Sequence, residues 1–380
     1  MSRTLTPIYA ANLASDVYDV KSVITRDDFL DDYKSDMEIK SANLPSGITG
    51  GYIFNKPHVI GMFSAGKGKY KGQAFVAIKG TASLYDALTD LNAGVHSSHT
   101  GFQVHQGFYY ALNSILQELR QFVSGLKGVS VIHCVGHSLG GAIATLAADW
   151  IKANSAISTV KLYAFGSPRV GLESFAAKCT SRLVANNVYR VYHRTDPVPM
   201  VPTWPFYHVP TNTGYLVDSP ASIKPWEYHL MKHYMRSAKS AGSWEGMASH
   251  CPIKHMDSAI EHWLQPDGVV SFAASTLEIL NAALIYVIKK VINLSGIAIV
   301  VGGGTTLTLL DRMAMYMAKA ANASKDLSIW VYHLVKKMAA LIGIKIKGGM
   351  DFTASFIRQV FMSLHRKISE VVWRIGQEVG

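Results

Sequence analysis

The feature that most constrains this chain is an apolar strand that runs directly into a serine flanked by glycines and then into a helix. Val131 to Val135 form the apolar run, GHSLGG follows at 136–141, and AIATLAADW at 142–150 continues as a helix. In this strand–turn–helix context the serine is forced into a strained backbone conformation, and the small glycines allow neighbouring segments to approach closely. The pattern predicts that Ser138 is a nucleophile above the end of a sheet, with the Leu139 backbone N–H directed at an oxyanion.

Strand-like and helix-like segments alternate on both sides of this motif. Strands are predicted at 51–56, 59–64, 73–80, 129–135, 160–165 and 188–193, and helical segments at 7–48, 106–124 and 139–153. Strands that alternate with helices of this length are typical of a mostly parallel sheet with helices on both faces. We therefore predict an α/β fold around the serine.

The pattern changes at about residue 269 to long apolar helices. Residues 269–380 contain 13 Lys and Arg but 6 Asp and Glu, so this part carries about +7 of the net charge of +11. We expect an α/β domain at 1–265 and an apolar, basic, all-α module at 266–380. The run 291–310 approaches the roughly 20 apolar residues that span a bilayer, but its three consecutive glycines favour an amphipathic module instead.

The basic charge favours an anionic partner, and the sequence narrows the choice. Zinc-finger spacing, an RNP-like aromatic strand and a dense arginine run are all missing, so we expect a phospholipid surface and no nucleic acid. The three cysteines, Cys134, Cys179 and Cys251, have neither metal-ligand nor redox spacing, and we expect no disulfide. The first residues lack a basic segment followed by an apolar run, which predicts synthesis in the cytoplasm without a cleavable signal peptide.

A nucleophilic serine needs a base that a carboxylate orients, and after this type of turn they follow in the order Ser, Asp, His. Asp196 ends a strand-like segment and precedes Pro-Val-Pro, so it lies in a rigid turn at the carboxyl edge of the sheet. Asp218 and Asp257 are weaker rivals. The residues alone leave the base open among six downstream histidines, which are His208, His229, His233, His250, His255 and His262.

Five motifs in order resemble those of the class 3 lipase family. They are IKGT at 78–81, VHQGF at 104–108, GHSLGG at 136–141, FGSPRVG at 165–171 and DPVP at 196–199. The resemblance covers roughly residues 50–240. It implies the α/β-hydrolase fold and hydrolysis of carboxylic ester bonds in lipids by a Ser-His-Asp triad, with no metal and no organic cofactor.

The same resemblance assigns roles that the residues leave open. The family's catalytic histidine opens an H-x4-Y stretch, which matches His229 and makes it the base, with His255 in reserve. The second oxyanion donor follows the glycine of the first motif and maps to Thr81, beside Leu139. Lys79 stands where family members have arginine, so the support of the oxyanion loop differs, because lysine lacks the planar bidentate contact. The segment 90–104 is short and polar where fungal relatives have an amphipathic lid.

The resulting hypothesis is a serine lipase or phospholipase that acts at a membrane or lipid surface through an acyl-enzyme. Glycerophospholipids are favoured over neutral glycerides, because each basic residue near an anionic surface contributes about 1 kcal/mol. The alternative is a structural role for the helical module, in which it packs on the hydrolase domain and covers its acyl groove.

The arrangement also resembles bacterial members with a C-terminal helical extension, some of them associated with type VI secretion. That resemblance implies export by a signal-independent route, with an immunity protein or part of the secretion apparatus as partner. The alternative hypothesis is a membrane-inserting or partner-docking toxin whose helical module carries the main activity. A degenerate hydrolase used only for binding is disfavoured by the intact Ser, Asp and His set.

Overall fold

A computed structural model describes every residue of the chain except 1–3, 22, 40–43, 48–57, 81–93, 204, 212, 218, 221–226, 248, 251–256, 266–273, 296–308, 324, 347–351 and 380. The chain divides into two compact units, one formed by Met1–Leu88, Val95–Pro252 and Trp373–Gly380, the other by Thr89–Gly94 and Ile253–Val372. The expected domain boundary at 265–266 stays a prediction. Several predicted features lie outside the described residues, namely the strand at 51–56, Thr81, Asp218, His255 and most of the apolar run 291–310.

The first unit is built on an eight-stranded sheet in the order β1-β4-β5-β8-β9-β10-β11-β12. The central strands β5 (Gln73–Ile78), β8 (Val131–His137), β9 (Thr159–Phe165), β10 (Val188–His193) and β11 (Gly214–Val217) are parallel. The edge strands β1 (Met37–Glu38) and β12 (Ser249–His250) are antiparallel to their neighbours, as is β4 (Gly61–Gly66), which lies between β1 and β5. The mostly parallel α/β sheet predicted from the sequence is therefore confirmed.

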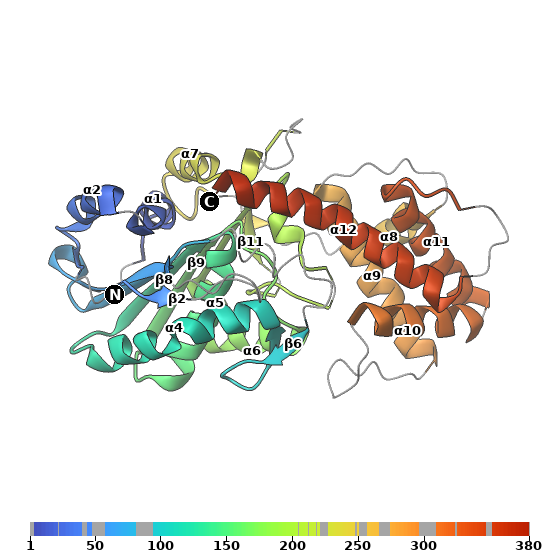
Figure 1. The fold of residues 1–380 in the computed structure, drawn as a ribbon, viewed down its shortest axis with the longest axis horizontal. Helices are drawn as coiled ribbons and strands as arrows, with labels where there is room; N and C mark the ends of the chain where they lie inside the picture. The colour runs from blue at the N-terminus through green and yellow to red at the C-terminus, as the bar shows by residue number, and fades with distance from the viewer. Residues whose placement is uncertain are drawn as a thin grey trace. The chain divides into compact units, whose positions relative to one another are not determined.

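Helices cover both faces of this sheet (Figure 1). One face carries α1 (Pro7–Asp16), α2 (Val23–Tyr33) and α7 (Met231–Ala241), and the other carries α4 (Gln106–Gly125), α5 (Leu139–Asn154) and α6 (Glu173–Leu183). The parallel strands β8 and β10 are buried along their whole length, as expected for strands covered on both faces. Because the central strands are parallel, their carboxyl ends lie at one edge of the sheet, where loops can bring polar groups together.

The single helical segment expected across 7–48 is wrong in extent. The chain forms α1, a 3₁₀ turn η1 at Val17–Lys21, α2 and then the short strands β1 and β2 (Ser46–Gly47). Thr6 caps α1, because its side chain accepts a hydrogen bond from the Tyr9 N–H, and Pro7 begins the helix. The apolar and charged residues of this region alternate in a helical rhythm throughout, so the pattern alone does not mark where the first helix stops.

Two aromatic side chains, one on the sheet and one in the turn after α7, hold the segment before α1 against the core. Tyr163 on β9 accepts the Leu5 N–H through its phenol oxygen at 3.0 Å, and Trp244 Nε1 donates to the Leu5 carbonyl at 2.7 Å. Leu5 itself is buried, as are both aromatic side chains. The two polar groups of the Leu5 backbone are thus paired inside the core, which holds the segment before α1 in place.

The second unit consists of packed amphipathic helices, α8 (Asp257–Leu264), α9 (Ala274–Ser295), α10 (Leu309–Ala323), α11 (Lys325–Leu341) and most of α12 (Ala354–Val379). Along α12 the buried positions recur at helical spacing, at Ile357, Val360, Phe361, Leu364 and Ile368. Among the described helices, none combines the length and apolarity needed to cross a membrane.

Replacing Tyr163 with phenylalanine should destabilise the first unit by about 1–3 kcal/mol, because the buried Leu5 N–H would lose its acceptor. Urea unfolding measures the change in the free energy of unfolding. The matched control is Tyr110→Phe, which removes the same hydroxyl from an exposed tyrosine. Equal losses in the two variants would show that the contact between Tyr163 and Leu5 does not fasten the start of the chain.

Candidate active site

Ser138 lies at the sharp turn between β8 and α5, and its backbone is strained. Its φ of 56° and ψ of −131° fall in a region that non-glycine residues rarely occupy. Two hydrogen bonds hold it there, from the Ser138 N–H to the Phe165 carbonyl at 2.8 Å and from the Gly141 N–H to the Ser138 carbonyl at 3.0 Å. A Cβ at Gly136 would lie 2.5 Å from the Gly140 carbonyl, so this turn requires a glycine. The strained turn predicted from the GHSLGG motif is confirmed.

Leu139 is the first residue of α5, directly after the serine. The first N–H groups of a helix have no partner within the helix, and the helix dipole adds positive potential there. A developing negative charge beside Ser138 Oγ would therefore meet a suitable donor at Leu139. Thr81, the second predicted donor, lies outside the described residues.

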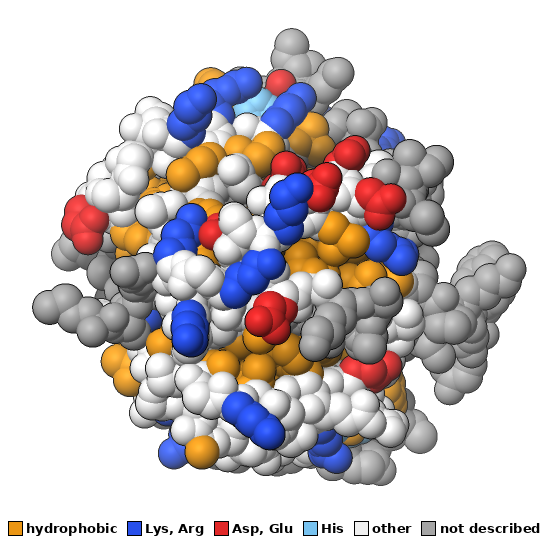
Figure 2. Space-filling view, turned by 90° about the vertical axis from the view of Figure 1, so that its left-hand side faces the viewer, with side chains coloured by type: hydrophobic (Ala, Val, Ile, Leu, Met, Phe, Trp, Pro, Cys, Tyr) orange, Lys and Arg blue, Asp and Glu red, His pale blue; other side chains and the backbone are white. Residues whose placement is uncertain are grey.

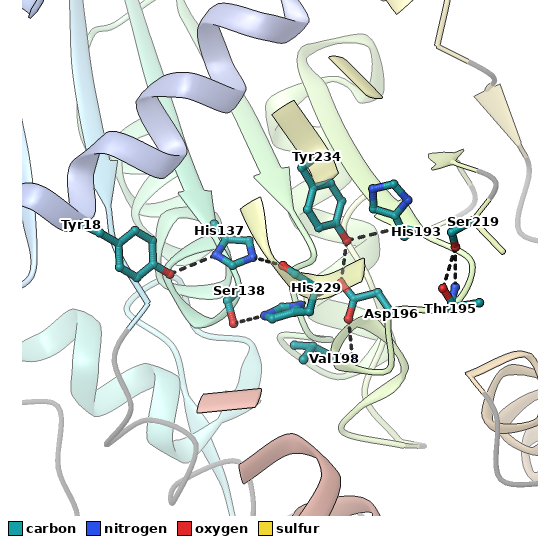
Figure 3. Close-up of polar contacts among 10 residues, drawn as sticks. All are labelled: Tyr18, His137, Ser138, His193, Thr195, Asp196, Val198, Ser219, His229 and Tyr234. Atoms are coloured by element: carbon teal, nitrogen blue, oxygen red, sulfur yellow. Dashed lines mark hydrogen bonds and ion pairs between the residues drawn. The ribbon is translucent and has the colours of Figure 1, made fainter. Parts of the chain in front are cut away.

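His229 and Asp196 meet Ser138 in one buried row of hydrogen bonds (Figure 3). His229 Nε2 lies 2.8 Å from Ser138 Oγ, and His229 Nδ1 lies 2.8 Å from Asp196 Oδ2. A carboxylate can only accept, so the His229 proton is assigned to Nδ1, which leaves Nε2 free to take the proton of the serine hydroxyl. All three side chains are fully buried, which strengthens these contacts because water does not compete for them.

Asp196 lies in the turn between β10 and η5 (Val198–Met200), as the Asp-Pro pattern predicts. Its Oδ1 accepts the Val198 N–H at 2.9 Å, and its Oδ2 accepts the hydroxyl of Tyr234 on α7 at 2.6 Å. Gly166, at a φ of +54°, leaves room for this group, since a Cβ there would lie 2.8 Å from Asp196 Oδ2. Tyr234 ends the H-x4-Y stretch, but the motif alone does not predict its contact with the carboxylate.

A second row of polar contacts lies behind the serine and was not foreseen from the sequence (Figure 3). His137 Nε2 lies 2.8 Å from the His229 carbonyl oxygen, and His137 Nδ1 lies 3.1 Å from the Tyr18 hydroxyl. Burial lowers the pKa of His137 well below its usual value. The signal for His137 was its place inside GHSLGG, whereas Tyr18 belongs to no motif.

The remaining sequence candidates occupy other positions. His208 follows the Tyr207 bridge to Gly171, His233 lies on α7 beside Tyr228, His250 ends β12 and His262 is exposed on α8. The rival acid Asp257 begins α8 and is exposed. The other rival acid Asp218 and the reserve base His255 lie outside the described residues. His229 and Asp196 are thus the predicted pair that stands in line with Ser138.

Two motif departures can be followed in the structure. Lys79 is buried after β5, and its N–H donates to the Ile60 carbonyl at 3.0 Å. Within the short polar segment discussed above, β6 (Val95–Ser97) and β7 (Gln103–His105) form an antiparallel hairpin. Within the described part of the chain, no group of three or more His, Cys, Asp or Glu residues could hold a metal ion.

Comparison with known proteins places this geometry in context. Residues 75–206 match the family described as lipase (class 3). The secreted mono- and diacylglycerol lipase 1 of Fusarium solani is 32% identical over 178 residues, which are 46% of this chain and 52% of that protein. Toxin TseL of Vibrio cholerae is 36% identical over 118 residues, 30% of this chain and 18% of TseL. The chain therefore spans about half or less of the length of these relatives.

Solved structures give a looser likeness. Lipase II from Rhizopus niveus is 19% identical, with a TM-score of 0.42 over 57% of this chain and 82% of that one. The triacylglyceride lipase of Rhizomucor miehei is 24% identical, with a TM-score of 0.39 over 55% of this chain and 78% of that one.

Acid should weaken the fold through His193, which ends β10 beside Tyr234. Burial lowers the pKa of His193 to about 4, and the nearby Asp196 carboxylate opposes this shift. The unfolded chain takes up this proton near pH 6.5 and the folded chain only near pH 4, so stability present above pH 6.5 is lost as the pH falls through that window. His193→Phe should flatten the pH dependence of urea unfolding by up to about 1.4 kcal/mol per pH unit.

The matched control for this measurement is His262→Phe, which replaces an exposed histidine of α8. A His193→Phe protein that loses stability toward acid as steeply as the wild type and this control would show that His193 does not link folding to pH.

Proposed function

We propose that this chain, whose residues 75–206 match the class 3 lipase family, is a serine lipase that hydrolyses carboxylic ester bonds of lipids through an acyl-enzyme. The observation that carries the proposal is the buried row in which His229 lies 2.8 Å from both Ser138 Oγ and Asp196 Oδ2. The strained turn at Ser138 supports it, since this conformation directs the hydroxyl away from the sheet and toward the base.

In the acylation step Ser138 is the nucleophile, His229 is the base and then the acid, and Asp196 orients His229. His229 Nε2 takes the Ser138 proton while Oγ forms a bond to the ester carbonyl carbon, and the carbonyl oxygen becomes an oxyanion. The Leu139 N–H and, by the family resemblance, the Thr81 N–H stabilise that charge. The protonated His229 then gives its proton to the departing alcohol as the C–O bond breaks. Asp196 stabilises the imidazolium and keeps the proton of His229 on Nδ1.

Deacylation repeats the sequence with water in place of the serine. His229 takes a proton from water, whose oxygen bonds to the acyl carbon, and the same donors stabilise the second oxyanion. Collapse of this intermediate breaks the bond to Ser138 Oγ and releases the fatty acid, while His229 returns the proton to the serine.

The function predicts that Ser138→Ala lowers kcat by about 10⁴-fold or more on short-chain nitrophenyl esters and on phospholipid vesicles, because no acyl-enzyme can form. Released nitrophenol and fatty acid are measured, and circular dichroism checks the fold. The matched control is Ser124→Ala, which changes an exposed serine of α4. Equal activity of Ser138→Ala and wild type would exclude Ser138 as nucleophile.

The lipid surface is the finer part of the proposal. We propose that residues 1–265 form the hydrolase and that the basic helices of 266–380 hold it on anionic phospholipid. Exposed cations of that helical part include Lys319, Lys345 and Arg366. On the face drawn in Figure 2, Lys and Arg side chains lie among Asp and Glu side chains, so its described residues form no continuous basic patch.

Reversing Lys319, Lys345 and Arg366 to glutamate should weaken binding to vesicles with anionic lipid, since each basic residue near such a surface contributes about 1 kcal/mol. Sedimentation with the vesicles measures binding, and hydrolysis of a soluble ester should not change. The matched control reverses three exposed lysines of the first unit, Lys71, Lys127 and Lys178, to glutamate. Equal weakening in both triple variants would assign the effect to net charge and not to the helical part.

The second candidate function is that of a toxin whose helical part damages or docks at a membrane, with export by a signal-independent route and an immunity protein or secretion component as partner. The observation that favours it is the match to a relative named a toxin. The two functions separate in one assay of vesicle leakage, because leakage caused by hydrolysis requires Ser138. Leakage that persists in Ser138→Ala would favour the helical part as the active element.

A further inference from the structure

A row of three hydrogen bonds connects the N-terminal segment to both sides of the candidate site, and Figure 3 shows the two that His137 makes. The Gly80 N–H donates to the Tyr18 oxygen at 3.0 Å, and Tyr18 in turn lies 3.1 Å from His137 Nδ1. His137 Nε2 lies 2.8 Å from the carbonyl oxygen of His229. Tyr18 and His137 are 119 residues apart in the chain, so only the fold brings them together.

The direction of each bond in this row follows from its chemistry. Burial lowers the pKa of His137, so its ring is neutral and carries one proton. The His229 carbonyl can only accept, which places that proton on Nε2 and leaves Nδ1 as an acceptor. Burial raises the pKa of the Tyr18 phenol, so its hydroxyl keeps its hydrogen and donates it to Nδ1. Each donor in the row then has one acceptor.

One end of the row fixes the backbone that leads to the oxyanion loop. Gly80 Cα lies in the same rigid peptide plane as the N–H of Thr81, the predicted second oxyanion donor. A Cβ at Gly80 would lie 2.7 Å from the Tyr18 oxygen and 3.4 Å from Ser138 Cβ, so this backbone passes directly beside the nucleophile. Holding the Gly80 N–H therefore fixes the peptide plane that enters Gly80, so the chain continues toward Thr81 from a defined position beside Ser138.

The other end of the row fixes the base. His137 is the covalent neighbour of Ser138 and is buried, as is His229. Its ring lies 4.6 Å from the His229 ring, measured between centroids. By donating to the His229 carbonyl, His137 ties the backbone of the base to the turn that carries the nucleophile.

We propose that Tyr18 and His137 are positioning residues for ester hydrolysis: Tyr18 holds the oxyanion loop through Gly80, and His137 holds the backbone of His229. The inference rests on the proposed function, because it assigns these residues to the same Ser138 site. Each residue acts through the group that it holds, Gly80 for Tyr18 and His229 for His137.

The test of Tyr18 compares Tyr18→Phe with wild type on an ester and on the matching thionoester, in which sulfur replaces the carbonyl oxygen. Phenylalanine keeps the ring but leaves the Gly80 N–H without this acceptor. We expect kcat on the ester to fall about tenfold to hundredfold with KM nearly unchanged, since a misplaced oxyanion donor acts in the transition state. The ester-to-thionoester rate ratio should fall too, because the donors stabilise a sulfur anion poorly.

The matched control is Tyr33→Phe, which removes another buried hydroxyl of the N-terminal segment, one that donates to Asp16 at 2.8 Å. Active sites are counted by titration with a fluorophosphonate, so a smaller folded fraction is not mistaken for a slower enzyme. A purely structural role would lower the hydrolysis rates of the ester and the thionoester by the same factor, so the ester-to-thionoester rate ratio would not change. Tyr18→Phe would then behave like Tyr33→Phe. That result would overturn the role of Tyr18.

Two variants of His137 separate the two ends of the row. His137→Gln places an amide donor near the Nε2 position and keeps the bond to His229 but loses the acceptor for Tyr18. His137→Asn keeps an acceptor near the Nδ1 position and loses the bond to His229. The Gln variant should lower the ester-to-thionoester rate ratio as Tyr18→Phe does. The Asn variant should lower the hydrolysis rates of both substrates by the same factor. Two variants with the same ratio would overturn the assignment of His137.

Failure of the function and failure of this inference give different results. A wild type that neither hydrolyses esters nor reacts with the fluorophosphonate would overturn the proposed function and this inference with it. An active wild type that loses activity in Ser138→Ala but keeps full activity in Tyr18→Phe would overturn this inference alone.

Discussion

The buried carboxylate of Asp196 is the interaction on which the arrangement of the candidate site depends. Placing a charge without exposed surface inside a protein costs several kcal/mol unless donors surround it. Three donors do so, the Val198 N–H, His229 Nδ1 and the Tyr234 hydroxyl. Val198 begins η5 in the turn that carries Asp196, whereas His229 and Tyr234 come from η6 (Glu227–His229) and α7, so satisfying one carboxylate holds η6 and α7 at the same edge of the sheet as this turn.

The strained serine turn is the second constraint, and the sheet supports it. A positive φ at a non-glycine residue costs of order 1–3 kcal/mol and persists only where its surroundings fix it. The Ser138 N–H donates to the Phe165 carbonyl on the neighbouring strand, and α5 begins at the next residue. Gly166, directly after Phe165, in turn leaves the space that Asp196 and Tyr234 occupy. The β9 terminus therefore serves both the nucleophile and the acid.

Local patterns predicted the parts of this site that local geometry determines. The turn at Ser138 and the acid position at Asp196 follow from glycine and proline spacing within a few residues. His229 did not follow from the residues alone, because its pairing with Ser138 spans 91 positions, and it required the resemblance to class 3 lipases. Tyr18 was missed for the same reason, since its partners Gly80 and His137 are remote in sequence and no periodicity connects them.

The N-terminal segment illustrates why such long-range contacts matter for chemistry. It carries none of the family motifs, yet Tyr163 and Trp244 hold Leu5, and α1 packs on α7, the helix that supplies Tyr234. Tyr18 lies in the 3₁₀ turn directly after α1 and reaches Gly80 and His137. A loss of packing around α1 would thus loosen the contacts of both the acid and the oxyanion loop. In this fold the packing of the N-terminal segment and the geometry of the site are coupled, because the segment that Leu5 holds in the core also carries Tyr18 to Gly80 and His137.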